Sequence, residues 1–436
     1  MTELTPLAEI AERAERLVAM SPADATSIAW IESRHGEVVE SVRTRRAGAE
    51  TRRSVLFRVR VGGRTGRSRA ESAVAGDLQR SLRAALADAR CAEPTPEWAL
   101  DAARREPAAL AGLVDPALCA LEAHAAQREL QGRAQRRSTL RLRWRETRLA
   151  VAATFHPTRA TALTEAAFEA RTGRRPGSGF AASSARRLSE LDIDRHLAAA
   201  RELEAPAVDP DAARPGAPAV LAAEAVAVFV DALARHALNG GRRLAGGKAP
   251  DLRLPEALRI VDDPLAATGL PLPFDLDGCA KRPRVFIERG WVVAAAADLD
   301  LAARLGLEPT AHALAGDDAW PDHLVVEPRG SSEAELLAAA GGGLRVGALE
   351  SLVVEPGETM PFRAVARNLR RIAADGALGA ALSPHVWRGT LRDLFATLEG
   401  IGRDSVSWAP RSGATGAVRT PALALRVIDG LTPLAP

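Results

Sequence analysis

Apolar residues in the first half of the chain follow two different periods. Over residues 5–20 and 72–90 they recur every three or four positions, which predicts two amphipathic helices. Between these segments, residues 54–61 alternate, with valines and a phenylalanine on one face and arginines on the other. A period of two is typical of a half-buried strand, so we expect Arg58 and Arg60 to face water.

Strand-like patterns continue along the rest of this half. The Gly-Gly pair at 62–63 predicts a hairpin turn after the first alternating strand. From residue 138 a second set of strands begins: leucines and a tryptophan alternate with arginines over 140–145, residues 149–154 continue in extended form, and the segments 161–171 and 180–187 predict two more strands. A helix over 188–203 follows them. We therefore expect a meandering sheet with flanking helices.

The second half is expected to be mainly β. An apolar strand at 219–221 and a helix at 224–238 are followed by many short apolar segments and Gly-rich turns. Between the halves, four separated prolines discourage regular structure. The predicted fold class is α+β, with an N-terminal α+β domain over 1–204, a linker over 205–218 and a mainly β C-terminal domain over 219–436.

Composition narrows the classes of function. The 436 residues carry a formal net charge of only +3, and no aromatic residues interleave with the arginine clusters, so nucleic-acid binding is not expected. The most apolar run, residues 291–297, is too short to cross a membrane, and the N-terminus has no apolar signal region. The three cysteines, Cys91, Cys119 and Cys279, are scattered, which favours reduced thiols in a cytoplasmic protein.

The second half also carries short motifs rich in Asp and Gly. The sequence PFDLDG contains Phe274, Asp275, Asp277 and Gly278, and the sequence GGGLRV begins with Gly341, Gly342 and Gly343. With several other segments in the same order, these motifs resemble the TldD/PmbA family. The segments are 261–264, 273–278, 286–291, 298–312, 323–331, 341–346, 401–404 and 425–431. The resemblance implies that the two named loops are family motifs or bind peptide.

Members of this family that resemble TldD carry a zinc-binding helix with the sequence His-Glu-x-x-x-His, which this chain lacks. Its eight histidines include no pair four or five residues apart. In the helix that aligns best, Val230 and Arg235 occupy the ligand positions and Asp231 occupies the general-base position. Valine cannot bind a metal, and arginine brings a fixed positive charge. Shifting the alignment by one residue pairs Asp231 with His236 but places Ala232 at the base position, so the chemistry still fails.

TldD-like members also have a cysteine ligand near the C-terminus, and this chain has no cysteine after Cys279. In lacking the zinc-binding motif, the chain resembles the PmbA/TldE branch of the family. The resemblance implies a subunit with no catalytic residues and no metal cofactor of its own. It also implies a TldD-like partner that carries zinc, in a heterodimer or larger complex, and unfolded or leader-containing peptides as substrates for trimming. We expect such peptides to bind by adding a strand to a sheet edge.

Two other functions stay open. One is an autonomous hydrolase that uses His312, His323 or the aspartate loop, and a stoichiometric transition metal in the isolated chain would favour it. The other is a homodimeric peptide-binding scaffold with no peptidase partner.

The remaining candidate residues each fit a structural role as well. His312 and His323 fit either a metal pair or ordinary loop and strand histidines. The aspartates fit a carboxylate or cation site, but we favour turn formation through side-chain-to-backbone bonds; they are Asp262, Asp263, Asp275 and Asp277. The glycines at 341–343 are expected to form a turn rather than a phosphate loop, and Cys279 a structural thiol.

Overall fold

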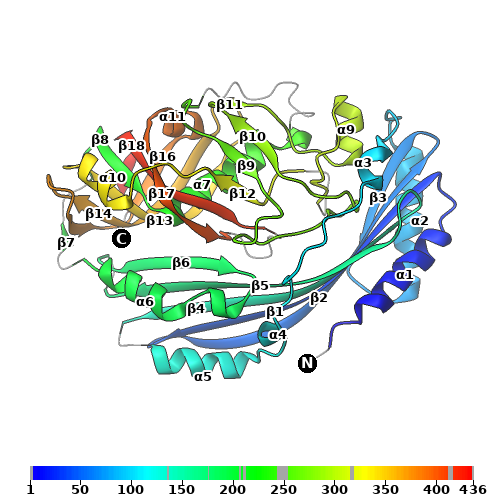
Figure 1. Ribbon diagram of the computed structural model, residues 1–436, viewed down its shortest axis with the longest axis horizontal. Coiled ribbons are helices and arrows are strands. Elements are labelled where there is room, and N and C mark those ends of the chain that lie inside the picture. The colour runs from blue at the N-terminus through cyan, green and yellow to red at the C-terminus, as the bar shows by residue number, and fades with distance from the viewer. Residues whose placement is uncertain are drawn as a thin grey trace.

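The first half of the protein forms one long, curved antiparallel sheet. The computed structural model describes residues 3–134, 137–174, 176–205, 208–209, 213–242, 254–314, 319–410 and 416–434. The strands lie in the order β3-β2-β1-β4-β5-β6, so two antiparallel meanders meet where β1 pairs with β4 (Figure 1). Their bounds are β1 (Ala25–Ser41), β2 (Arg45–Val61), β3 (Arg64–Ala70), β4 (Thr139–Ala153), β5 (Arg159–Thr172) and β6 (Gly179–Ala185).

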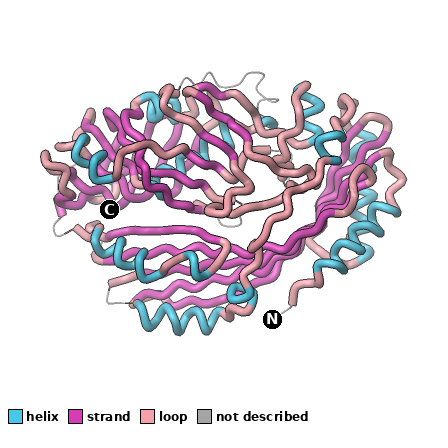
Figure 2. The backbone as a smooth tube through the Cα atoms, in the orientation of Figure 1, coloured by secondary structure: helices cyan, strands magenta, loops and turns pink. Residues whose placement is uncertain are grey.

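Helices cover one face of this sheet, and the C-terminal domain lies against the other (Figure 2). The alternation along β1 explains this division, because Ile28, Trp30 and Val38 are fully buried against the helices. The covering helices are α1 (Leu7–Ala19), α2 (Ala75–Cys91), α5 (Ala123–Arg133) and α6 (Ile193–Glu202). Two short helices, α3 (Leu100–Arg104) and α4 (Pro116–Cys119), and a 3-10 turn (Leu188–Glu190) lie in the connections.

The second half is built on a thirteen-stranded mixed sheet within the described ranges. Its main path is β11-β10-β9-β12-β18-β8-β13-β14-β15-β7, with β16, β17 and β19 paired alongside. The strands are β7 (Val208–Asp209), β8 (Ala217–Leu221), β9 (Ile260–Asp262), β10 (Arg284–Glu288), β11 (Trp291–Val292), β12 (Leu324–Val326), β13 (Leu344–Val354), β14 (Pro361–Ile372), β15 (Leu378–Leu382), β16 (His385–Thr390), β17 (Leu398–Trp408), β18 (Val418–Ile428) and β19 (Leu431–Pro433). The helices of this half that lie wholly within the described residues are α7 (Ala223–Ala237), α9 (Leu299–Leu305), α10 (Glu333–Ala339) and α11 (Leu391–Ala396). This architecture confirms the predicted α+β fold class.

Helix α7 runs through the centre of the C-terminal domain. It packs against β13, β17 and β18, and its side chains belong to the largest hydrophobic cluster of the protein. Phe229 contributes two edge-to-face aromatic contacts there, with Phe362 at 5.1 Å and Trp387 at 5.3 Å between ring centroids. The helix ends where the Nδ2 of Asn239 donates to the carbonyl of Arg235 at 3.2 Å.

The expectation that Arg58 and Arg60 face water is wrong. Both side chains are only 8% exposed, because the C-terminal domain and the segment before α3 cover that face of β2. Arg60 donates to the Oγ1 and carbonyl oxygen of Thr95 at 2.8 and 2.7 Å. The alternation of β2 therefore marks two buried faces, of which one is apolar and the other charged.

The segment predicted as a linker, residues 205–218, follows α6 and includes β7 and the first residues of β8, which belong to the second sheet. Residues 206–207 and 210–212 of that segment fall outside the described residues, while β7 within it pairs in parallel with β15. None of the helices in the described ranges is long and apolar enough to span a membrane.

Candidate functional site

The positions aligned with the family's zinc-binding helix lie in α7, inside the C-terminal domain. Val230 is 1% exposed and packs in the main core, and Asp231 is also buried. The Nε of Arg235 donates to the Oδ2 of Asp231 at 3.0 Å, one helical turn away. A guanidinium thus occupies the neighbourhood of the carboxylate that a zinc enzyme would need as a base. Within the ranges that the structure describes, no group of three potential metal ligands includes a residue of α7.

The loop over residues 274–278 lies at the junction of the two domains. Phe274 is 3% exposed and packs in a cluster with Ala29, Leu149 and Val151 of the first sheet. The Oδ1 of Asp275 accepts hydrogen bonds from the backbone N–H groups of residues 277 and 279 at 3.0 and 2.8 Å. The expected turn-forming role of this aspartate is confirmed.

Gly278 allows the same loop to approach the first domain closely. Its φ of +76° is in the left-handed region, and a Cβ there would lie 2.4 Å from the Nε2 of His156. That Nε2 lies 2.9 Å from the carbonyl oxygen of Asp277, and Arg159 donates to the carbonyl of Gly278. The loop thus joins the two domains, and its role in peptide binding stays a prediction.

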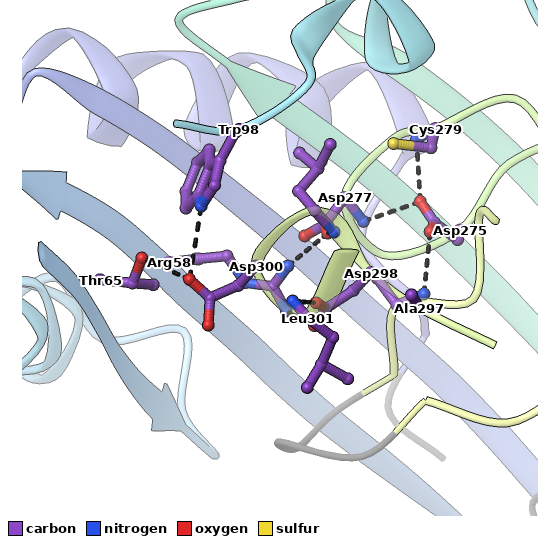
Figure 3. Close-up of polar contacts among 12 residues, drawn as sticks. Arg58, Thr65, Trp98, Asp275, Asp277, Cys279, Ala297, Asp298, Asp300 and Leu301 are labelled. Atoms are coloured by element: carbon purple, nitrogen blue, oxygen red, sulfur yellow. Dashed lines mark hydrogen bonds and ion pairs between the residues drawn. The ribbon is translucent and has the colours of Figure 1, made fainter. Parts of the chain in front are cut away.

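A cluster of buried charges surrounds this loop (Figure 3). Arg58, on β2, donates to Asp277 and, at 2.8 Å, to the Oδ2 of Asp298, which caps the N-terminus of α9. Arg67, on β3, lies 3.2 Å from Asp298 and 3.5 Å from Asp300. Two cations from the first sheet therefore meet three buried carboxylates from the C-terminal domain.

Burial and neighbouring charges move the pKa values of these carboxyl groups in opposite directions. Burial and the adjacent Asp277 raise the pKa of Asp275 to about 7. For Asp298, burial acts upward, but Arg58 and Arg67 outweigh it and hold its pKa below the ordinary value. At a pH between the ordinary pKa of an aspartate and about 7, the folded chain keeps a proton on Asp275 that the unfolded chain has lost. The stability contributed by Asp275 is therefore lost as pH rises through about 7.

Cys279 lies beside this cluster and is expected to be unreactive. It is 2% exposed, and burial followed by the charges of Asp275 and Asp277 raises its pKa well above the ordinary value. Cys91 is exposed at the end of α2. We predict that iodoacetamide modifies Cys91 in the folded protein and leaves Cys279 intact until denaturant is added, as read by peptide mass spectrometry. Rapid modification of Cys279 under native conditions would contradict the buried junction.

The two histidines named from the sequence, His312 and His323, belong to a second buried network. The Nε2 of His312 lies 3.0 Å from the Oδ2 of Asp262, and its Nδ1 lies 2.8 Å from the Oγ1 of Thr310. The backbone N–H of His323 donates to the Oδ1 of Asp262 at 2.7 Å. The order Thr-His-Asp is similar to a nucleophile with its base, but Thr310 is 7% exposed and already bonds both backbone groups of Ala297.

The second network also contains a group of residues that could hold a metal ion. Asp262, Asp322 and His323 place potential ligand atoms within 4.8 Å of one another, and all three are buried. His312 is not in that group, so the structure does not bring the two histidines to one ion. The Nζ of Lys281 lies 3.3 Å from the Oδ1 of Asp322 and supplies a positive charge there. Burial followed by Lys281 lowers the pKa of His312 below its ordinary value, which favours the neutral imidazole.

The glycines at 341–343 form a turn, as expected, between α10 and β13. Their three backbone N–H groups all donate to carbonyl oxygens, of Ala338, Ile372 and Ala340 respectively. A phosphate-binding loop needs free N–H groups that point at the ligand. A Cβ at Gly343 would lie 2.2 Å from the carbonyl of Pro218, so glycine is needed there for close backbone packing.

Three residues of these sites were not identified from the sequence. They are the cations of the two buried networks, Arg58, Arg67 and Lys281. They could not be identified because each lies far along the chain from the carboxylate with which it pairs. Lys281 carries one signal, because it is one of only two lysines in a chain that otherwise uses arginine.

Comparisons with known proteins agree with the motifs in the second half. Residues 215–429 match the family model of the PmbA/TldA metallopeptidase C-terminal domain. No curated protein sequence matches the chain.

Three solved structures share the fold over almost the whole chain. A proposed modulator of a DNA gyrase from Thermotoga maritima has a TM-score of 0.78 at 18% identity, covering 96% of this chain and 99% of its own. TldE from Thermococcus kodakarensis has a TM-score of 0.73 at 16% identity, covering 97% and 99%. A proposed modulator of DNA gyrase from Bacteroides thetaiotaomicron has a TM-score of 0.76 at 16% identity, covering 98% and 99%. At these identities the likeness establishes the fold.

Proposed function

We propose that this chain, whose residues 215–429 carry the C-terminal domain of the PmbA/TldD family, is the non-catalytic subunit of a two-component metallopeptidase. The observation that carries the proposal is the set of residues in α7 at the positions aligned with the zinc ligands. Its ligand positions hold a buried valine and an arginine that is paired with Asp231. The helix is retained and packed while the groups for zinc chemistry are replaced, which suits a subunit kept for assembly and binding.

In this proposal the zinc belongs to a TldD-like partner that carries the His-Glu-x-x-x-His helix. The present chain would contribute part of the enclosure that admits unfolded or leader-containing peptides for trimming. Sheet edges offer main-chain donors and acceptors that can hold an extended peptide without regard to its side chains. The short edge strand β11 is a candidate, since Trp291 within it and Val293 directly after it are 52% and 56% exposed.

Co-purification tests the proposal directly. The chain is produced alone and together with a His-Glu-x-x-x-His subunit, and native mass spectrometry and elemental analysis follow. We expect a stable complex whose zinc content matches the number of partner subunits. We expect the chain alone to contain no stoichiometric zinc. A chain that stays separate from such a partner would contradict the proposal.

One observation favours a second candidate, a metal-dependent hydrolase that needs no partner. It is the grouping of Asp262, Asp322 and His323 within 4.8 Å. Against it stands the buried ammonium of Lys281, since a divalent cation beside Asp322 would meet a like charge. Peptide cleavage by the purified chain alone, abolished by a chelator and by Asp262→Asn, would support this second candidate.

A further inference from the structure

A pocket opens on the face of the first sheet that is turned toward the C-terminal domain. Its volume is about 510 Å³, within the range of roughly 300–1,000 Å³ that ligand sites occupy. Strands β1, β2, β4, β5 and β6 line it, and Leu270 and Ala409 of the C-terminal domain contribute to its wall. We call it the arginine pocket, after the arginines of its lining, which are Arg46, Arg52, Arg141, Arg143 and Arg145.

Cations outnumber anions in this lining. Five arginines face three glutamates, and each glutamate is already paired with an arginine. The pairs are Glu37 with Arg46 and Arg141, Glu50 with Arg52, and Glu165 with Arg145. A ligand that enters therefore meets neutralised carboxylates and guanidinium groups with further N–H donors.

The pKa of His35, which also lines the pocket, is lowered in part by the same arginines. Burial, followed by the charges of Arg145 and Arg52, lowers the pKa of His35 to about 4. The Nε2 of this imidazole lies 2.7 Å from the Oγ of Ser33. Near neutral pH the imidazole adds no further charge to the pocket, so the arginines alone provide the cationic field.

Arg143 lies in the wall nearest the C-terminal domain. Its Nη2 donates to Glu169 at 3.1 Å, and its guanidinium carbon lies 5.6 Å from the ring centroid of Trp408. In the described part of the chain, its buried Nε has no hydrogen-bond partner. Buried donors are almost always satisfied in folded proteins, so this N–H is available to an acceptor that enters the pocket.

Small residues leave room for a ligand backbone over the sheet. Gly48 pairs with Glu37 in the register of β1 and β2, and a Cβ at Gly48 would meet no heavy atom within 4 Å. Ala167 pairs with Arg143 and with Ser184 on the neighbouring strands, so short side chains stand beside the arginines. The pocket thus combines an open strip of backbone with flanking guanidinium groups.

Building on the proposed function, we propose that the arginine pocket binds an acidic segment of the peptide substrate. Carboxylates of the peptide pair with Arg52, Arg143 and Arg145, while the paired glutamates accept hydrogen bonds from its backbone N–H groups. The other polyanion that arginines bind is nucleic acid. The tryptophans that adjoin the pocket, Trp144 and Trp408, are 3% and 6% exposed, so neither offers a face on which a base can stack.

Fluorescence anisotropy on the intact chain, without a partner, tests this site. The probes are a labelled hexapeptide with two glutamates and its counterpart with two glutamines. We expect the acidic peptide to bind about tenfold more tightly, with an affinity that falls as salt increases. Arg52→Gln is the informative variant, because this arginine is 65% exposed and its loss leaves the core intact. It should weaken binding of the acidic peptide about fivefold to tenfold and leave the neutral peptide unchanged.

Arg128→Gln is the matched control, with the same loss of charge on α5, the helix that covers the opposite face of the sheet. It should bind both peptides like the parent protein. Equal affinity for the acidic and neutral peptides, or equal effects of the two substitutions, would overturn the site. Tighter binding of a single-stranded oligonucleotide than of the acidic peptide would also overturn it.

The outcomes separate this site from the proposed function. If the chain supports cleavage of both peptides by the partner at equal rates and binds them equally, the acidic preference fails and the partner role stands. If the chain binds the acidic peptide through Arg52 but the partner cleaves without it, the site stands and the partner role fails.

Discussion

Replacing Arg58 with methionine is expected to lower the free energy of unfolding by about 3–5 kcal/mol. Arg58 is the cation that Asp277 and Asp298 share, and both carboxylates are buried. Methionine fills a similar volume but leaves Asp277 unpaired and Asp298 with only Arg67, which lies at 3.2 Å. Because the pair crosses from β2 to the C-terminal domain, the loss also weakens the contact between the domains.

Arg60→Met provides a matched control on the same strand. Arg60 is buried to the same extent and points to the same face, but its contacts are with neutral groups: it donates to Thr95, and its guanidinium carbon lies 5.7 Å from the ring centroid of Trp98. We expect this variant to lose only about 1–2 kcal/mol, the range for hydrogen bonds without a stranded charge. Urea unfolding followed by fluorescence measures both variants. Equal losses would show that the carboxylates at the junction do not depend on Arg58.

Lys281→Met is expected to have an effect of similar size, about 3–5 kcal/mol, in the second network. The ammonium is 4% exposed and lies 3.3 Å from the Oδ1 of Asp322. Burial acts to lower the pKa of Lys281, but Asp322 and Asp262 outweigh it and raise the pKa, so the lysine stays charged. Without it, two buried carboxylates lose their compensating cation.

The loss should depend on pH in a defined direction. A buried carboxylate deprived of its ammonium takes up a proton in the folded state at a pH where the unfolded chain does not. The variant should therefore regain stability as pH falls from about 8 to about 5, so its deficit relative to the parent shrinks. The double variant Lys281→Met with Asp322→Asn should be more stable than Lys281→Met alone near neutral pH. A deficit that grows on acidification would contradict this account of the network.

Local patterns in the sequence were enough to predict most of the elements and the fold class. The helical spacing at 5–20 and 224–238 corresponds to α1 (Leu7–Ala19) and α7 (Ala223–Ala237), because these helices bury one or more apolar faces. Asp275 was correctly expected to form a turn, since its bonds reach only two and four residues along the chain.

Features that depend on contacts between distant segments could not be predicted in the same way. The period of two in β2 shows that its arginines share a face, but not what covers that face. The partners of Arg58 lie 219 and 240 residues further along the chain. Arginines that alternate with apolar residues look the same whether water or a carboxylate faces them.

The same limit applies to the second network. Asp262, Lys281, His312 and Asp322 come together only when β9, β12 and the loops beside them are in place. The sequence identified His312 and His323 as candidate metal ligands. It did not identify Lys281, whose ammonium lies beside Asp322, where a bound metal ion would otherwise lie. The residues of α7, by contrast, are known from the sequence alone, so the prediction that Val230 and Arg235 occupy the ligand positions needs no contact between distant segments.

We propose that this chain serves a zinc-bearing partner instead of cleaving peptides itself. The decisive experiment compares the rate at which a His-Glu-x-x-x-His subunit cleaves an unstructured peptide alone and with this chain added. We expect cleavage when both subunits are present and none from either subunit alone. Cleavage at the same rate by the partner without this chain would contradict it.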